Sequence, residues 1–189
     1  VGIFAFLSVY GLTLSIKAQY DTYEFSGHEA TLFALKRYVK LVLSFTLPFI
    51  FCMGVTYLTH TSRYGDGFFE DIINALLDFL GVSHIFGTQM QINTWWYLSL
   101  EVMLIFFVPF LVRFYKRYGW LIVFMSLLVG SFMLEKHVHL TKYLFVAPLA
   151  VCFADQEVLE RLKAFRIVKN GFLNKALKFV LSTGALYIL

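Results

Sequence analysis

One carboxylate stands inside an otherwise apolar stretch of the chain, in the segment NTWWYLSLEVMLIFFVPFL at residues 93–111. If this segment is a membrane helix, Trp95, Trp96 and Tyr97 at its start lie at headgroup level, where amphipathic rings are favoured. Glu101 then lies roughly 9 Å deeper, where a carboxylate is costly unless it is paired, protonated or facing a wet cavity. Glu101 is therefore a candidate functional residue, and the alternative is a side chain that snorkels outward or hydrogen-bonds a neighbouring helix.

A second group of candidates is cationic and lies in the sequence KRYVK at residues 36–40. Lys36 and Lys40 are one helical turn apart, and Arg37 lies beside them. This basic cluster, Lys36, Arg37 and Lys40, could hold the phosphates of a nucleotide-like cofactor, because Arg offers a planar fork and Lys a point charge. Anchoring of a membrane segment by cytoplasmic basic residues explains the same spacing.

Metal and nucleic-acid chemistry are not favoured by the sequence. The five histidines include no pair one helical turn apart within an apolar segment, so neither a metal site nor a proton relay is predicted. No CxxC pair, glycine-rich phosphate loop or GxSxG motif is present. We interpret the net charge of +4 as a signal of membrane topology rather than of nucleic-acid binding.

The elements that position these candidates are predicted to be membrane-spanning helices. Apolar residue types make up 59% of the 189 residues and charged types 15%, against roughly 45–50% and about 25% in soluble domains. Lys, Arg, Asp and Glu are absent from residues 41–62, 79–100 and 118–134, and a helix needs about 20 residues to cross the hydrocarbon layer. Because backbone groups in lipid must be satisfied within their own segment, we predict an all-α polytopic transmembrane helix bundle.

We predict a single membrane domain over residues 1–189 with about six spans. The spans cover residues 1–16, 41–58, 94–112, 119–134, 143–154 and 178–189. Because the first and last of them are cut short, we expect a fragment of a longer protein, truncated at both ends. Each of the three prolines, Pro48, Pro109 and Pro148, falls inside a span, which membrane helices tolerate.

Basic residues are distributed unequally between the two sides that six spans define. Of the 16 Lys and Arg residues, all except Arg63, Lys136 and Lys142 fall on one side. Short cytoplasmic loops retain such an excess. We therefore predict a multi-pass protein of the inner or plasma membrane, with loop 17–40 cytoplasmic and loop 59–93 extracytoplasmic.

The long outer loop is predicted to contain an amphipathic helix. Apolar residues recur there at helical spacing, and Glu70, Asp71, Asn74 and Asp78 occupy the opposing face. We expect this helix to lie along the outer interface, and the alternative is that it covers the mouth of the bundle as a substrate lid.

Four segments carry local patterns that occur together, in the same order, in one membrane family. They are FAFLSVYGLTLS (4–15), FALKRYVKLVLSFTLPF (33–49), NTWWYLSLEVMLIFFVPFL (93–111) and YLFVAPLAVCFADQEVLERL (143–162). The first resembles the second helix of the integral-membrane acyltransferase 3 family, and the second resembles the basic entry to the third helix of that family. The third segment resembles its tryptophan-rich helix start, and the fourth resembles its short helix with the inner-loop exit. Departures are Val9, where the family usually has Gly after Ser, and Ala147-Pro148, where it usually has Gly.

The resemblance implies a membrane O-acyltransferase that moves an acyl group, usually acetyl, from cytoplasmic acyl-CoA to a sugar of the cell surface. Acetyl-CoA would be the donor substrate, with no metal. The implied partners are the lipid bilayer, acyl-CoA and a glycan acceptor, with no nucleic acid.

The resemblance also implies roles for particular residues. The basic cluster would face the phosphates of the donor from the cytoplasm, and Glu101, Asn93 and Trp96 would help to orient the acceptor hydroxyl. Donor and acceptor would approach from opposite sides of the bilayer, so a wet interior path is expected. The catalytic His of the family and its partner Arg lie on a first helix that would precede Val1, so no general base is nominated and the fragment alone is expected to be inactive.

Two other classes of protein share these features. A transporter or polysaccharide flippase would have the same composition, prolines and buried Glu101, but it also needs internal repeats or paired broken helices, and no repeat at a fixed period is found. A purely structural membrane anchor predicts that Glu101 can be replaced by Gln or Leu without effect.

Overall fold

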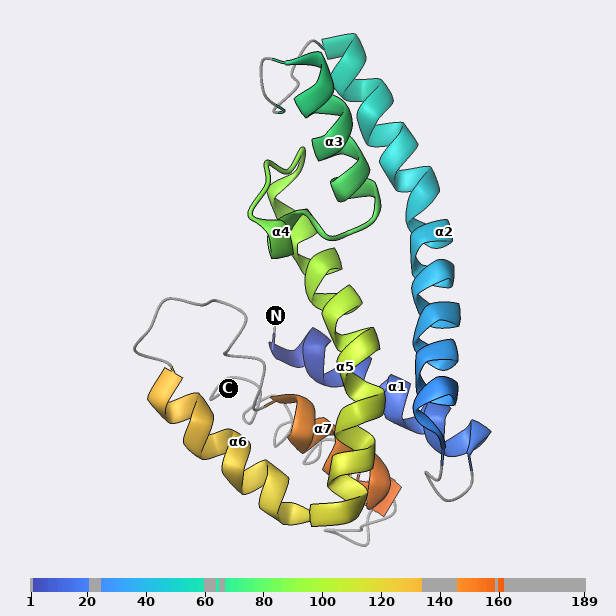
Figure 1. Cartoon of the computed structure of the whole chain (residues 1–189), viewed down its shortest axis with the longest axis vertical. Helices are drawn as coiled ribbons and strands as arrows, with labels where there is room; N and C mark the ends of the chain where they lie inside the picture. Colours follow the sequence, from blue (N-terminus) through green and yellow to red (C-terminus); the bar gives the residue numbers. More distant parts are fainter. Residues whose placement is uncertain are drawn as a thin grey trace, which may run out of the picture.

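The computed structural model describes residues 2–20, 25–59, 64, 67–133, 146–158 and 160–161, with side chains left out at 127–133. These ranges contain helices and the turns between them and no strand (Figure 1). The helices are α1 Gly2–Gln19, α2 Gly27–Thr59, α3 Phe68–Phe79, α4 Ser83–Phe86, the 3₁₀ turn η1 Asn93–Trp95, α5 Trp96–Tyr118, α6 Trp120–Met133 and α7 Val146–Asp155. The all-α prediction is thereby confirmed for the described part of the chain.

Three of these helical segments are long and apolar enough to cross a bilayer. They are α1 with 18 residues, α2 with 33 and the continuous segment of η1 and α5 with 26. Helices α6 and α7 overlap two further predicted spans but have 14 and 10 residues, fewer than the roughly 20 that a perpendicular crossing needs. The predicted span at 178–189 lies outside the described residues. The chain is therefore compatible with a membrane protein, and the number of six spans stays a prediction.

Helix α2 begins at Gly27 rather than at residue 41, where the apolar span was predicted to start. Its start is fixed by a capping box in which the Ser26 N–H donates to Glu29 Oε2 at 2.6 Å and the Glu29 N–H donates to Ser26 Oγ at 3.2 Å. The basic cluster consequently lies within a continuous helix and not in a loop.

Proline 48 interrupts the hydrogen bonding of α2 without ending the helix. Proline has no N–H, so the carbonyl of Ser44, four residues earlier, loses its helical donor. The helix therefore has a weak point about two-thirds of the way along its length.

Helix α5 is the centre of the packing. Helices α1, α6 and α7 pack against it, α2 stands beside it, and α3 lies along the upper part of α2 (Figure 1). Small residues allow α1 and α7 to approach closely, since Ala5, Ala147, Ala150 and Ala154 are all buried. Val9, at the position where the resembled family usually has Gly, is fully buried in the same contact region.

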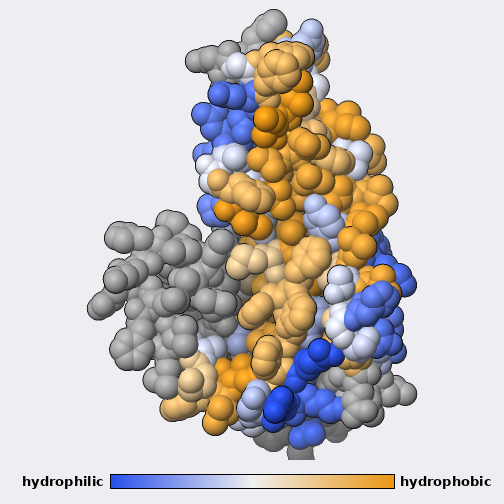
Figure 2. Space-filling view, viewed as in Figure 1, coloured by the Kyte–Doolittle hydropathy of each residue, from blue (hydrophilic) through white to orange (hydrophobic). Residues whose placement is uncertain are grey.

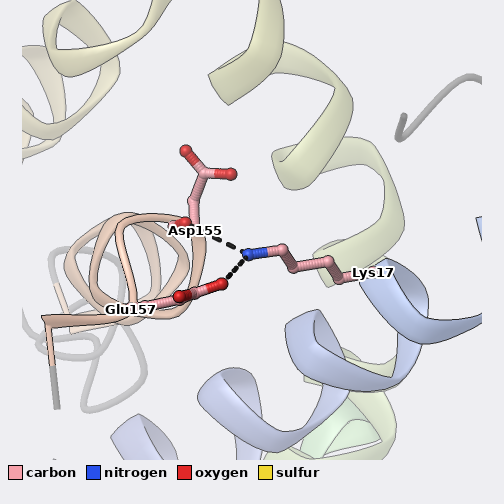
Figure 3. A network of polar contacts seen from close by, with 3 residues as sticks. All are labelled: Lys17, Asp155 and Glu157. Atoms are coloured by element: carbon pink, nitrogen blue, oxygen red, sulfur yellow. Dashed lines mark hydrogen bonds and ion pairs between the residues drawn. The ribbon is translucent and has the colours of Figure 1, made fainter. Parts of the chain in front are cut away.

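Several helix ends meet at one end of the molecule. The Lys17 ammonium, at the end of α1, donates to Glu157 Oε1 at 2.8 Å and to the Asp155 carbonyl at 3.4 Å (Figure 3). The Arg113 guanidinium, near the end of α5, donates to the carbonyl of Phe25 and lies 5.4 Å from the centre of its ring. Loops predicted to share the cytoplasmic side thus begin at the same end of the bundle, and the compartment itself stays a prediction.

Helix α3 confirms that the long loop contains a helix at the predicted residues. Its orientation is unusual for a helix over water, because Phe68, Phe69 and Ile73 are exposed whereas Asp78 is buried. Its location at a bilayer interface stays a prediction.

Candidate functional site

A pocket of about 220 Å³ lies between α1, α2 and α5. Its polar side chains are Arg37, Lys40, Ser44 and Glu101, and its apolar walls are Leu12, Leu41 and Ile105. The carboxylate singled out in the sequence thus shares one pocket with two members of the basic cluster.

Helical spacing explains why these residues meet. Arg37, Lys40 and Ser44 follow one another at intervals of three and four residues along α2, so they lie on one face of it. Glu101 and Ile105 are likewise one turn apart on α5. The guanidinium of Arg37 lies 5.5 Å from the centre of the Phe33 ring, and this cation–π contact helps to hold it toward the pocket.

The carboxylate of Glu101 has hydrogen-bonding capacity that its described surroundings do not use. Its Oε2 atom is buried and has no hydrogen-bond partner among the described residues. Within the same part of the chain, the one ion pair shorter than 4.0 Å is that of Lys17 with Glu157, so Glu101 does not pair directly with Arg37 or Lys40. Two cations and a carboxylate that face one pocket without bonding to each other can take up a ligand with both an acceptor and a donor group.

Three other predicted site residues do not line this pocket. Lys36 on α2 is exposed and lies outside the pocket, and Asn93 is exposed in η1. Trp96 is half-buried at the start of α5, with its ring centre 6.3 Å from that of His84 and 6.3 Å from that of Tyr97. Of the six predicted site residues, only Arg37, Lys40 and Glu101 therefore lie in this pocket.

The tryptophan-rich start of α5 lies beside the middle of α2. The ring of Trp95 is 5.1 Å from that of Phe45 and 5.6 Å from that of Phe49, centre to centre. Both phenylalanines belong to the predicted span 41–58. Trp95 is therefore level with the interior of that apolar stretch and not with its outer end.

A second polar cluster was not anticipated from the sequence. Asp78, which is 2% exposed, accepts hydrogen bonds through Oδ2 from the Tyr64 hydroxyl and from the Gln91 backbone N–H, both at 2.8 Å. The Gln91 side-chain amide donates to Thr56 Oγ1 at 3.0 Å. The sequence placed Asp78 on the polar face of the amphipathic helix and did not indicate that this carboxylate is buried.

A larger cavity of about 370 Å³ lies between α5, α6 and α7. Its lining is apolar apart from the hydroxyls of Tyr118 and Ser126. Among the described residues that line it none is charged, so this lining offers a lipid-like surface rather than chemistry. In the described ranges no group of three or more His, Cys, Asp or Glu side chains is placed to hold a metal ion.

Comparison of the chain with protein-family models, with curated proteins and with solved structures finds no match.

Proposed function

We propose that this protein is a membrane O-acyltransferase and that its acyl donor and its acceptor meet in the pocket between α1, α2 and α5. The observation that carries the proposal is the meeting of Arg37, Lys40 and Glu101 in one pocket. These residues come from two of the segments that resemble the acyltransferase 3 family. The cell membrane is the proposed location, with the basic end of α2 toward the cytoplasm.

The size of the pocket restricts what it would hold. At about 220 Å³ it is smaller than the roughly 300–1,000 Å³ pockets that hold drug-sized ligands. It suits the thioester end of acyl-CoA together with one hydroxyl of a sugar. The nucleotide end would extend outside the pocket, where the exposed Lys36 could contact its phosphates.

The pocket residues suit the charges that acyl transfer develops. Attack of the acceptor oxygen on the thioester carbon forms a C–O bond and places negative charge on the carbonyl oxygen, which Arg37 and Lys40 would stabilise. Breaking the C–S bond then releases the thiol of CoA, which takes up the proton lost by the hydroxyl. The free Glu101 oxygen would accept a hydrogen bond from that hydroxyl and orient it.

The test is transfer of labelled acetyl groups from acetyl-CoA to surface glycan in membrane vesicles from cells that express the protein from its whole gene. Arg37→Ala and Lys40→Ala are expected to lower the initial rate by about 10²-fold, the cost of one oxyanion-stabilising group. Glu101→Gln is expected to lower it less, because the amide still accepts a hydrogen bond. Arg117→Ala, at the end of α5 outside the pocket, is the matched control of like charge.

Two outcomes would replace the proposal. If the pocket variants leave acetylation unchanged at equal protein levels, the acyltransferase reading is wrong. If they remove the glycan itself from the cell surface while the remaining glycan is normally acetylated, the protein is a transporter or flippase.

A further inference from the structure

Residues 67–91, which lie between α2 and α5 in the sequence, fold back along α2 rather than extending beyond its end. The Leu80 carbonyl accepts a hydrogen bond from the Tyr38 hydroxyl at 3.0 Å, and the Phe79 ring lies 5.3 Å from that of Phe49. At the other end of the segment, the Gln91 side chain binds Thr56. The contacts on α2 therefore extend from residue 38 to residue 56.

This part of α2 is the part that most requires lipid. Residues 41–59 contain no Lys, Arg, Asp or Glu. None of the residues in the most apolar 18-residue window of α2 is buried. A surface of this kind is stable only beside other apolar groups, and a bilayer supplies them over about 30 Å. Whatever lies alongside residues 41–59 lies at the same depth.

Helix α3 lies alongside this part of α2 and exposes its apolar face. Phe69 is 79% exposed and Ile73 56%. In Figure 2 the hydrophobic surface of α3 adjoins that of the upper part of α2. A helix on a water-covered loop would bury these side chains and expose its carboxylates, and α3 has the reverse arrangement at Asp78.

Two of the three acidic residues of α3 lie in its first turn, and the third is buried against protein. Glu70 and Asp71 are in the first turn of α3, at the end that lies near the end of α2. Asp78, near the other end, is covered by Tyr64 and Gln91 as described above. No Lys, Arg, Asp or Glu occurs from residue 79 to residue 100.

The turn that follows α3 is closed by its own hydrogen bonds. The Gly81 N–H donates to the Asp78 carbonyl and the Val82 N–H to the Leu77 carbonyl, both at 3.0 Å, which is the Schellman pattern of a helix end. Gly81 has a φ of +70°, and a Cβ on it would lie 2.8 Å from the side chain of Leu98. Non-helical backbone is tolerated at membrane depth only where it is buried against protein, and this turn is packed against α5.

We propose that residues 67–91 form a re-entrant hairpin that enters the bilayer from the side on which α2 ends. In this arrangement lipid acyl chains cover the exposed apolar face of α3. The start of α3 lies at the membrane surface and its end lies within the hydrocarbon layer.

Spin labelling of the protein in vesicles of phosphatidylcholine and phosphatidylglycerol tests this depth. Nitroxides are attached to Phe69→Cys, Ile73→Cys and Leu76→Cys in a background with Cys52→Ala and Cys152→Ala. Leu47→Cys on α2 is the lipid-facing reference, and Glu70→Cys is the polar control from the same helix. The measured quantities are accessibility to oxygen, which concentrates in lipid, and to a neutral nickel chelate, which stays in water.

A re-entrant hairpin gives an oxygen-to-nickel ratio that rises from residue 69 through 73 to 76, and the value at 76 approaches that at 47. Equal ratios at the three positions would mean a helix lying flat on the interface. High nickel accessibility at all three would mean exposure to water, and low accessibility to both reagents would mean coverage by a protein. Each of these three results overturns the proposal.

A second measurement covers the case in which the cysteine-free background does not fold. Membrane-impermeant maleimide is applied to intact cells that express the single replacements in the otherwise native chain. Glu70→Cys is expected to react and Leu76→Cys to stay unlabelled until detergent is added. Reaction of Leu76→Cys in intact cells would rule out the hairpin.

Discussion

Helices α2 and α5 have nearly equal hydropathy and opposite surroundings. Their most apolar 18-residue windows have mean hydropathies of 2.0 and 1.9, yet none of the first window is buried and 50% of the second is. α5 is enclosed by α1, α6 and α7, whereas the buried residues of α2, Ala30, Phe33 and Ala34, are confined to its beginning. Mean hydropathy therefore indicates that a helix avoids water, and only its neighbours decide whether protein or lipid covers it.

The largest expected effect comes from making the same truncation in both helices. Leu100→Ala removes a side chain that is 1% exposed in α5 and is expected to destabilise the protein by about 2–5 kcal/mol, because it leaves a cavity. Leu47→Ala removes one that is 77% exposed in α2 and is expected to change stability by less than about 0.5 kcal/mol. Thermal unfolding in detergent micelles measures both. Equal losses would contradict the contrast between the two helices.

The hydrogen bonds of Asp78 are expected to hold α3 to the residues around it. Asp78→Ala removes the acceptor that the Tyr64 hydroxyl and the Gln91 N–H share, at an expected cost of about 1–3 kcal/mol. Glu70→Ala, on the same helix but exposed, is the control. The measurement is hydrogen exchange of the α3 amides, which should accelerate in Asp78→Ala alone. Similar exchange in both variants would remove Asp78 as the anchor.

Alanine replacements at two glycines separate the cost of close packing against α5 from the cost of a left-handed backbone. Gly81 and Gly87 both have left-handed backbones, with φ of +70° and +66°, but only at Gly81 would a Cβ meet another residue, Leu98. Both alanine variants incur the left-handed cost, and Gly81→Ala should lose about 1–3 kcal/mol more through overpacking. Melting temperatures of the two variants give the difference. If they agree, the turn does not press on α5.

The smallest effect is expected where α1 meets the end of α7. The hydrogen bond and charge of Lys17 lower the pKa of the exposed Glu157. A lowered folded-state pKa means that this stabilisation is complete above the unfolded value and disappears as pH falls below about 4.3. Wild type and Glu157→Gln should therefore differ slightly in melting temperature at pH 7 and converge near pH 3. A difference that persists at pH 3 would show that the ion pair is not its source.

The sequence predicted the local elements better than their relations. Absence of charge and helical periodicity correctly predicted the all-helical class and the helix at α3, because these depend on neighbours within a few turns. The true start of α2 was also encoded locally, in the Ser26–Glu29 capping box, but the apolar pattern alone placed it at residue 41.

Meetings between distant residues could not be predicted in this way. That Arg37 and Lys40 share a pocket with Glu101 depends on how far α2 and α5 slide past each other, and side-chain spacing within one helix does not encode that offset. The burial of Asp78 depends on Tyr64 and Gln91, which lie 14 and 13 residues away along the chain.

Because Pro48 weakens α2, the folded-back segment affects how easily this helix bends. Ser44, whose carbonyl lacks a helical donor because of Pro48, lines the pocket, so the helix is most easily bent just above it. Residues 67–91 span that point, since they are hydrogen-bonded to Tyr38 on one side of the proline and to Thr56 on the other. They therefore brace α2 across the proline, and loss of either hydrogen bond would let the helix bend there more easily.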